Sequence, residues 1–275
     1  MLDSRNHLYQ VIMEFLLTKP VPNLDTVPEF YKLFESGNLT HVKERTFVLE
    51  ILRDGVRHYN DYVICGRTHI WEMVMSLYNS PLSTPAHNLL ITEILLSASK
   101  VPFVGRALVK SNGLFTWLAY HLSASTDVQM TGTLLMCAKN CVTDMLRSKR
   151  RAVYDAHTLI SPLLKTTKLG LSVEAVQAVL EFVDGLLLFY PSGEPLKSLI
   201  IPENLALLVE TGTSFVGSSR MSVDDAAWRR RCQSTIKVSK LLFSVNSNKN
   251  EMCIWNLSSF LSVVLSDQNL ISIPD

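Results

Sequence analysis

Apolar residues recur at helical spacing along most of this chain of 275 residues. The segment at about 41–59 is typical, since Phe47, Val48, Ile51, Leu52 and Val56 fall on one face of a helix. Such a line of apolar residues every three or four positions favours an α-helix. Segments that alternate between apolar and polar residues, as half-buried strands do, are absent from the sequence. The pattern therefore predicts an all-α fold without a sheet.

Turn and capping residues place the ends of these helices. Thr84 followed by Pro85 predicts an N-cap with proline at the first helical position. The run Ser111-Asn112-Gly113 predicts a helix end, because Asn and Gly accept the left-handed conformation. The predicted helices are 4–18, a short one around 30–34, 41–59, 85–99, 126–146 with a Thr126–Gln129 capping box, 171–189, 222–245 and 249–266.

The spacing of the predicted helices bears on the architecture. They come in pairs with short connections, at intervals of roughly 35–45 residues, which is the range of HEAT and armadillo units. A closed bundle of this length would need fewer and longer helices. We therefore predict an irregular α-solenoid of armadillo or HEAT type, forming a single solenoid-like domain over residues 1–275.

The balance of charge and hydrophobicity excludes several classes of protein. Lys and Arg total 26 and Asp and Glu total 25, while apolar residues make up 47% of the chain. A disordered chain has the opposite balance, and a basic nucleic-acid module carries a clear positive excess. The longest apolar stretch, 175–190, is interrupted by Gln177, Glu181 and Asp184, so no membrane span is expected.

Residues that could serve in catalysis or metal binding are scattered along the chain rather than grouped in known motifs. The chain has no G-x-S-x-G, G-x-x-x-x-G-K, G-x-G-x-x-G or H-E-x-x-H sequence. His69 and Glu72 share a helix face but lack a matching pair of ligands. Cys137 and Cys141 would need two more ligands to hold a metal, and buried cysteine commonly packs as a small apolar residue. We therefore expect no enzyme activity, no cofactor and no metal.

The cysteines and tryptophans are interpreted as structural residues. The five cysteines form no C-x-x-C pair, which favours reduced thiols over a disulfide framework. The tryptophans are predicted to anchor the apolar core rather than to stack on bases. They are Trp71, Trp117, Trp228 and Trp255.

Two basic runs stand out from the neutral total. The first comprises Arg147, Lys149, Arg150 and Arg151, and the second comprises Arg229, Arg230, Lys237 and Lys240. Cations at a helix C-terminus are favoured by the helix dipole, and solvated helix faces often carry such residues. The same runs can instead bind phosphates. They are therefore our candidate contacts for RNA or for a protein partner.

Three segments resemble a known family in sequence, order and spacing. Residues 44–57 read ERTFVLEILRDGVR and lead to Asp61-Tyr62, residues 76–82 read SLYNSPL, and residues 113–118 read GLFTWL. Together they resemble the C-terminal domain of the nucleolar pre-ribosomal-associated protein 1 family. The resemblance is best over residues 40–122. The residues that match the family pattern are Glu44, Arg45, Arg53, Asp54, Arg57 and Tyr62.

The resemblance implies a function in ribosome assembly. Family members are large nucleolar helical scaffolds without enzymatic activity that act in early assembly of the large ribosomal subunit. It implies pre-ribosomal assembly factors as partners, with direct contact to pre-rRNA left open, and neither a membrane nor a small-molecule substrate. It also implies that the chain is the C-terminal part of a larger protein. The matching residues are expected to be structural, with close helix packing at Gly55.

Two other interpretations stay open at this point. The near-neutral charge favours a cytosolic protein-interaction module of armadillo type that binds no nucleic acid. An all-α enzyme built from scattered His and Glu residues would require a pocket that gathers His69, Glu72 and a further histidine.

Overall fold

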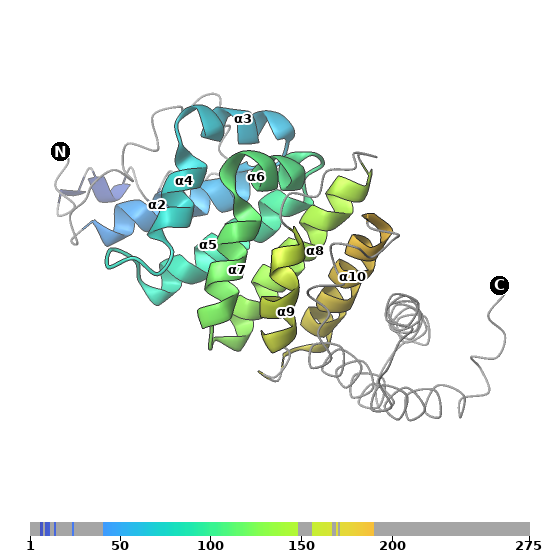
Figure 1. The fold of residues 1–275 in the computed structure, drawn as a ribbon. Helices are drawn as coiled ribbons and strands as arrows, with labels where there is room; N and C mark the ends of the chain where they lie inside the picture. The colour runs from blue at the N-terminus through green and yellow to red at the C-terminus, as the bar shows by residue number, and fades with distance from the viewer. Residues whose placement is uncertain are drawn as a thin grey trace, which may run out of the picture. The chain divides into compact units, whose positions relative to one another are not determined.

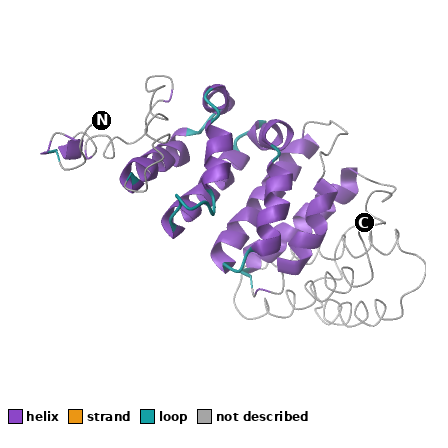
Figure 2. Cartoon of the chain, turned by 60° about the vertical axis from the view of Figure 1, so that its left-hand side comes forward, coloured by secondary structure: helices purple, strands orange, loops and turns teal. Residues whose placement is uncertain are grey.

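The structure is a computed structural model that describes residues 6–7, 9–11, 14, 24, 41–147, 156–166, 169 and 171–189. All regular elements among them are helices, and no strand occurs in these ranges (Figure 2). The predicted all-α fold is thereby confirmed. The predicted helices at 30–34, 222–245 and 249–266 lie outside the described residues. The chain divides into two compact units, Met1–Val104 and Gly105–Asp275, and the predicted solenoid remains a prediction.

The first unit is built from four described helices: α2 (Val42–Gly55), α3 (Tyr59–Arg67), α4 (Ile70–Leu77) and α5 (Pro85–Lys100). α2 packs against α5, α3 against α4, and α4 against α5 (Figure 1). The apolar faces predicted from the sequence supply this core. Its fully or nearly fully buried side chains include Val48, Leu49, Leu52, Trp71, Val74, Ile91, Ile94 and Leu95.

Helix α2 ends earlier than the sequence predicts. The periodicity suggested one helix over 41–59, but Val56 and His58 have extended backbones and α3 begins at Tyr59. The carboxylate of Asp61 accepts hydrogen bonds from the N–H groups of Arg57 (2.9 Å) and His58 (2.7 Å). It thus satisfies donors that the start of a new helix leaves without intrahelical partners.

Helix α5 begins where the sequence places it. The Thr84 hydroxyl oxygen accepts a hydrogen bond from the N–H of His87 at 3.2 Å, and Pro85 is the first helical residue. The predicted N-cap is therefore confirmed.

The second unit contains most of α6 (Val104–Asn112), then α7 (Leu114–Ala124), α8 (Val128–Arg147), η3 (Ala156–Leu159), α9 (Ile160–Thr166) and α10 (Val173–Phe189). α8 packs along α10, and α7 packs against α9 and η3 (Figure 1). Gly113 has φ +65° between α6 and α7, which confirms the predicted helix end. Lys139 of α8 and Glu181 of α10 form an ion pair at 3.1 Å.

Helix α8 has a different cap from the predicted one. The sequence favoured a Thr126–Gln129 capping box, but the helix begins at Val128. The Asp127 carboxylate instead accepts a hydrogen bond from the N–H of Met130 at 2.8 Å. Asp127 rather than Thr126 is the N-cap because it directly precedes the first helical residue. From that position its side chain reaches the N–H three residues further on.

Among the described residues, no single helix is long and apolar enough to cross a membrane. Taken together, α5 and α6 are long and apolar enough, but the pair is bent at the break between the two helices.

Candidate functional site

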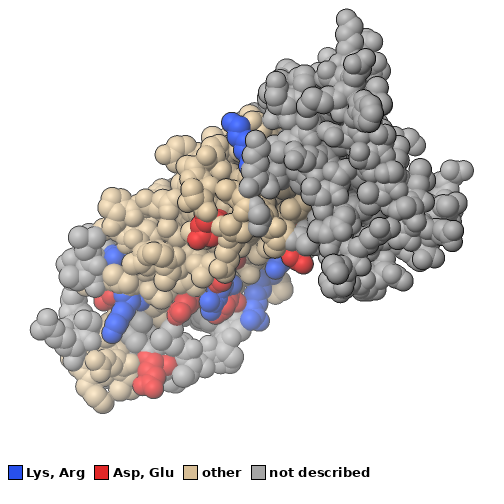
Figure 3. All heavy atoms as spheres, turned by 90° about the horizontal axis from the view of Figure 1, so that it is seen from below, with Lys and Arg blue, Asp and Glu red and all other residues tan. Residues whose placement is uncertain are grey.

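Only one of the eight predicted contact residues lies among the described residues. Arg147 is exposed at the C-terminal end of α8. Lys149, Arg150, Arg151, Arg229, Arg230, Lys237 and Lys240 lie outside the described ranges. On the face shown in Figure 3, the described basic and acidic side chains are interspersed rather than gathered by sign. The basic runs therefore remain predicted contacts.

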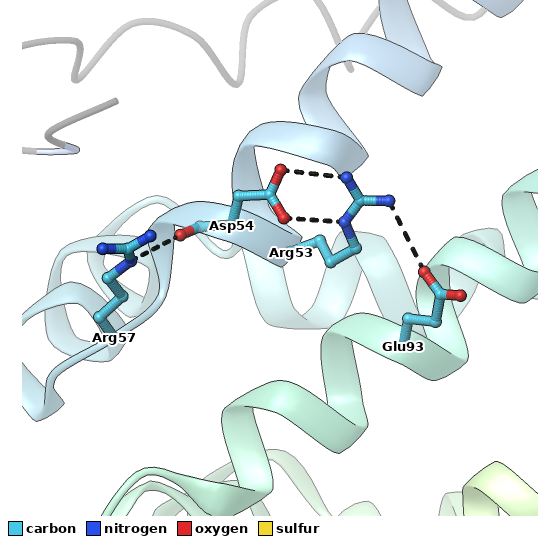
Figure 4. Close-up of polar contacts among 4 residues, drawn as sticks. All are labelled: Arg53, Asp54, Arg57 and Glu93. Atoms are coloured by element: carbon cyan, nitrogen blue, oxygen red, sulfur yellow. Dashed lines mark hydrogen bonds and ion pairs between the residues drawn. The ribbon is translucent and has the colours of Figure 1, made fainter. Parts of the chain in front are cut away.

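The best-defined polar cluster in the family-like segment lies at the end of α2 (Figure 4). The Arg53 guanidinium donates two hydrogen bonds to the Asp54 carboxylate, at 2.9 and 3.0 Å. One Arg53 nitrogen also lies 3.7 Å from the Glu93 carboxylate, which joins α2 to α5. The hydrogen bonds from Arg53 hold the pKa of Asp54 below its ordinary value, so the pair remains charged.

Arg57 completes this cluster. Its Nε–H donates to the backbone carbonyl of Asp54 at 3.1 Å, and its backbone N–H donates to Asp61. Gly55, which lies between Asp54 and Arg57 in the sequence, is buried. A Cβ atom at this position would lie 3.2 Å from Leu24 Cδ2. Gly55 is closely packed, although against Leu24 rather than against another described helix as expected, and the cluster fixes the path of the chain from α2 into α3.

A buried histidine that the sequence analysis did not single out joins α2 to α5. His87 Nδ1 accepts a hydrogen bond from the N–H of Thr84 at 3.3 Å, which places the ring proton on Nε2. Nε2 lies 3.0 Å from Thr46 Oγ1 and 3.3 Å from the carbonyl oxygen of Val42. Burial lowers the pKa of His87, and the nearby positive charge of Arg45 lowers it further, against the opposing effect of the Val42 carbonyl.

The neutral His87 is expected to make the protein less stable as the pH falls below about 6.5, the ordinary pKa of histidine. In that range the unfolded chain takes up a proton that the folded ring resists, so the free energy of unfolding decreases. The stability that His87 contributes is fully present above the pKa of the unfolded state. It is lost as the pH falls from there to the lower pKa of the folded state. One such group adds at most about 1.4 kcal/mol per pH unit.

Urea unfolding of wild type and His87→Asn across this pH range checks the expectation. The wild type should lose stability more steeply than the variant. His121, whose pKa burial also lowers, is present in both proteins and cancels in the comparison. Equal slopes would show that His87 is protonated as readily in the folded state as in the unfolded one.

The residues considered for metal binding do not converge. Among the described residues, no group of three or more His, Cys, Asp and Glu side chains is placed to hold a metal ion. Cys137 and Cys141 are both buried, and a hydrogen bond between the two thiols together with burial raises the pKa of Cys141 well above its ordinary value. They therefore pack as predicted, as small core residues.

The tryptophan prediction can be checked at two positions. Trp71 is fully buried and its Nε1–H donates to the backbone carbonyl of Tyr62 at 3.1 Å. Trp117 is half-buried on α7 beside His121, with ring centres 4.4 Å apart. Trp71 is thus a core anchor, while Trp228 and Trp255 lie outside the described residues.

Comparison with known proteins points to one family. Residues 1–117 match the family model described as nucleolar pre-ribosomal-associated protein 1. The resemblance to this family is confirmed for that range. It contains the whole polar cluster at the end of α2 and the His87 contacts.

Two relatives carry the name nucleolar pre-ribosomal-associated protein 1, one from Mus musculus and one from Homo sapiens. Each is 32% identical over 123 residues, which is 45% of this chain and 5% of the relative. The chain therefore matches only a small part of each relative's length. A crystal structure of an engineered protein superposes with a TM-score of 0.47 at 13% identity, over 88% of this chain and 97% of that one, and this level of similarity supports no conclusion.

Proposed function

We propose that this chain is a non-catalytic helical scaffold in early nucleolar assembly of the large ribosomal subunit, where it binds assembly factors and pre-rRNA. The observation that carries the proposal is the 32% identity over 123 residues to proteins named nucleolar and pre-ribosomal-associated. The structure supports a structural use of the family-like residues. Arg53 and Asp54 pair with each other, and Tyr62 is buried against Trp71.

Imaging and gradient sedimentation of the tagged full chain test this proposal. The protein should concentrate in the nucleolus and sediment with particles that contain precursor RNA of the large subunit. Diffuse cytosolic signal without such sedimentation would contradict it and would favour the cytosolic protein-interaction module.

Reversing the charges of the first basic run should weaken association with RNA. The change replaces Arg147, Lys149, Arg150 and Arg151 by glutamate. Each phosphate contact that is lost should flatten the dependence of the logarithm of affinity on the logarithm of salt concentration by about 0.7 for single-stranded RNA. Binding of the purified variant to labelled RNA at several salt concentrations measures both effects.

A control makes the same kind of charge change at two residues elsewhere, and it is compared with a variant of the run in which only Arg150 and Arg151 are replaced by glutamate. Arg67 and Lys110 are exposed at the ends of α3 and α6, so their replacement by glutamate should alter RNA binding less. The same comparison applies to Arg229, Arg230, Lys237 and Lys240. If a reversed run binds RNA as the wild type does, its residues are not RNA contacts, although the scaffold function would stand.

A further inference from the structure

Two large aromatic rings are exposed together in the first unit. Tyr59 begins α3 and is 45% exposed, and Phe103 follows α5 and is 52% exposed. Their ring centres are 6.5 Å apart with the planes at 90°. The pair therefore forms a corner of two perpendicular aromatic rings at the surface.

The Tyr59 ring is held in place by a stack that reaches into the core. Its centre lies 5.8 Å from that of Tyr62, which in turn lies 5.4 Å from that of Trp71. Tyr62 and Trp71 are buried, and the indole N–H of Trp71 is bonded to the Tyr62 carbonyl. A ring fixed in this way loses little freedom when a flat partner stacks on it.

Phe103 occupies its position at a cost to stability. Its backbone has φ +69°, a conformation that suits glycine and is strained for a bulky side chain. The residue remains 52% exposed, so burial does not fully recover this cost. Strained backbones of this kind cluster at ligand-binding positions. Stability alone does not explain a phenylalanine here.

An arginine, Arg57, lies two residues before Tyr59 in the sequence and carries hydrogen-bond donors that the described residues do not use. Arg57 is exposed, and its Nε–H is bonded to the Asp54 carbonyl, as Figure 4 shows. Its two terminal amino groups make no hydrogen bond or ion pair with the described residues. The nearby carboxylates are engaged elsewhere, since Asp54 accepts from Arg53 and Asp61 accepts from backbone N–H groups. Arg57 thus presents an oriented fork that fits a phosphate.

We propose that Arg57, Tyr59 and Phe103 form a binding site for a nucleotide of single-stranded RNA, with the base stacked on the aromatic corner and the phosphate bound by Arg57. Single strands are held by this combination of aromatic stacking and cationic contacts to the backbone. The inference rests on the proposed function, in which the chain meets pre-rRNA. Residues 57–60 read Arg-His-Tyr-Asn and are all exposed, which favours RNA over an apolar protein surface as the occupant.

Fluorescence anisotropy of the full chain with labelled single-stranded oligouridine tests the site. Phe103→Gly should keep or raise the melting temperature, because glycine suits the backbone, while affinity falls by about tenfold through lost stacking. Tyr59→Ala should weaken binding similarly, and neither change should alter the salt dependence. Arg57→Gln should reduce the slope against the logarithm of salt by about 0.7, the contribution of one phosphate.

Tyr120→Ala and Arg67→Gln are the matched controls, because Tyr120 is 72% exposed in the second unit and Arg67 is exposed at the far end of α3. Both should bind as wild type. The site would be overturned if the Phe103, Tyr59 and Arg57 variants bound RNA as well as the two control variants do, or if the wild type bound no RNA. Sedimentation with pre-ribosomal particles would still test the proposed function independently. Unchanged RNA binding with loss of an assembly protein from the particles would make the corner a protein contact instead.

Discussion

Replacing Trp71 by alanine is expected to lower the free energy of unfolding by about 3–5 kcal/mol, as truncation of a large buried aromatic side chain does. The Trp71 ring is fully buried, lies in the stack with Tyr62, and donates its N–H to the Tyr62 carbonyl. Alanine leaves a cavity and a buried carbonyl without that donor. Urea unfolding followed by circular dichroism measures the loss.

Two variants separate the causes of this loss. Trp71→Phe keeps much of the ring but removes the hydrogen bond, so it should cost less than alanine. Tyr120→Ala removes a ring that is 72% exposed and should change stability by no more than about 0.5 kcal/mol. A Trp71→Ala variant as stable as Tyr120→Ala would show that the aromatic stack does not support the first unit.

Replacing Gly185 by alanine is expected to destabilise the second unit by about 1–3 kcal/mol, the usual cost of overpacking. A Cβ at Gly185 of α10 would lie 2.5 Å from Val142 Cγ1 of α8, and the β-branched valine has little freedom to turn away. This clash opposes the gain of about 1 kcal/mol that alanine brings to a helix interior. Thermal and urea unfolding both report the outcome.

Gly66→Ala is the matched control, since Gly66 lies in α3 and a Cβ there meets nothing within 4 Å. It should stabilise the protein by up to about 1 kcal/mol. Combining Gly185→Ala with Val142→Ala should remove the clash, so the pair should be less destabilising than the two single changes added together. Stabilisation by Gly185→Ala alone would mean that α8 and α10 are not in such close contact.

The local features of the fold follow from the sequence. Thr84 and Pro85 start α5 and Gly113 ends α6 as predicted, because each acts on the backbone within a few residues. The apolar period of α2 likewise predicts its buried face. The family resemblance also rests on local strings of residues, and the match over residues 1–117 confirms it.

Features that depend on distant partners could not be predicted in this way. Arg53 of α2 forms an ion pair with Glu93 of α5, and neither helix alone indicates that the two side chains meet. His87 meets Val42, 45 positions away, and nothing in either local pattern indicates the contact. The Tyr59–Phe103 corner could not be predicted for the same reason, since Tyr59 lies at a helix end and Phe103 between two helices, and neither position indicates the other.

The buried thiols make the chain its own reporter of local opening. Burial raises the pKa of Cys65 to about 12, so its reactive thiolate is scarce in the folded first unit, and Cys137 and Cys141 are enclosed in the second. Alkylating reagents react only with the thiolate and must contact the sulfur directly. These cysteines are therefore labelled only when the surrounding helices separate. The labelling rates of these cysteines therefore give the opening free energy of each unit separately, without any engineered probe.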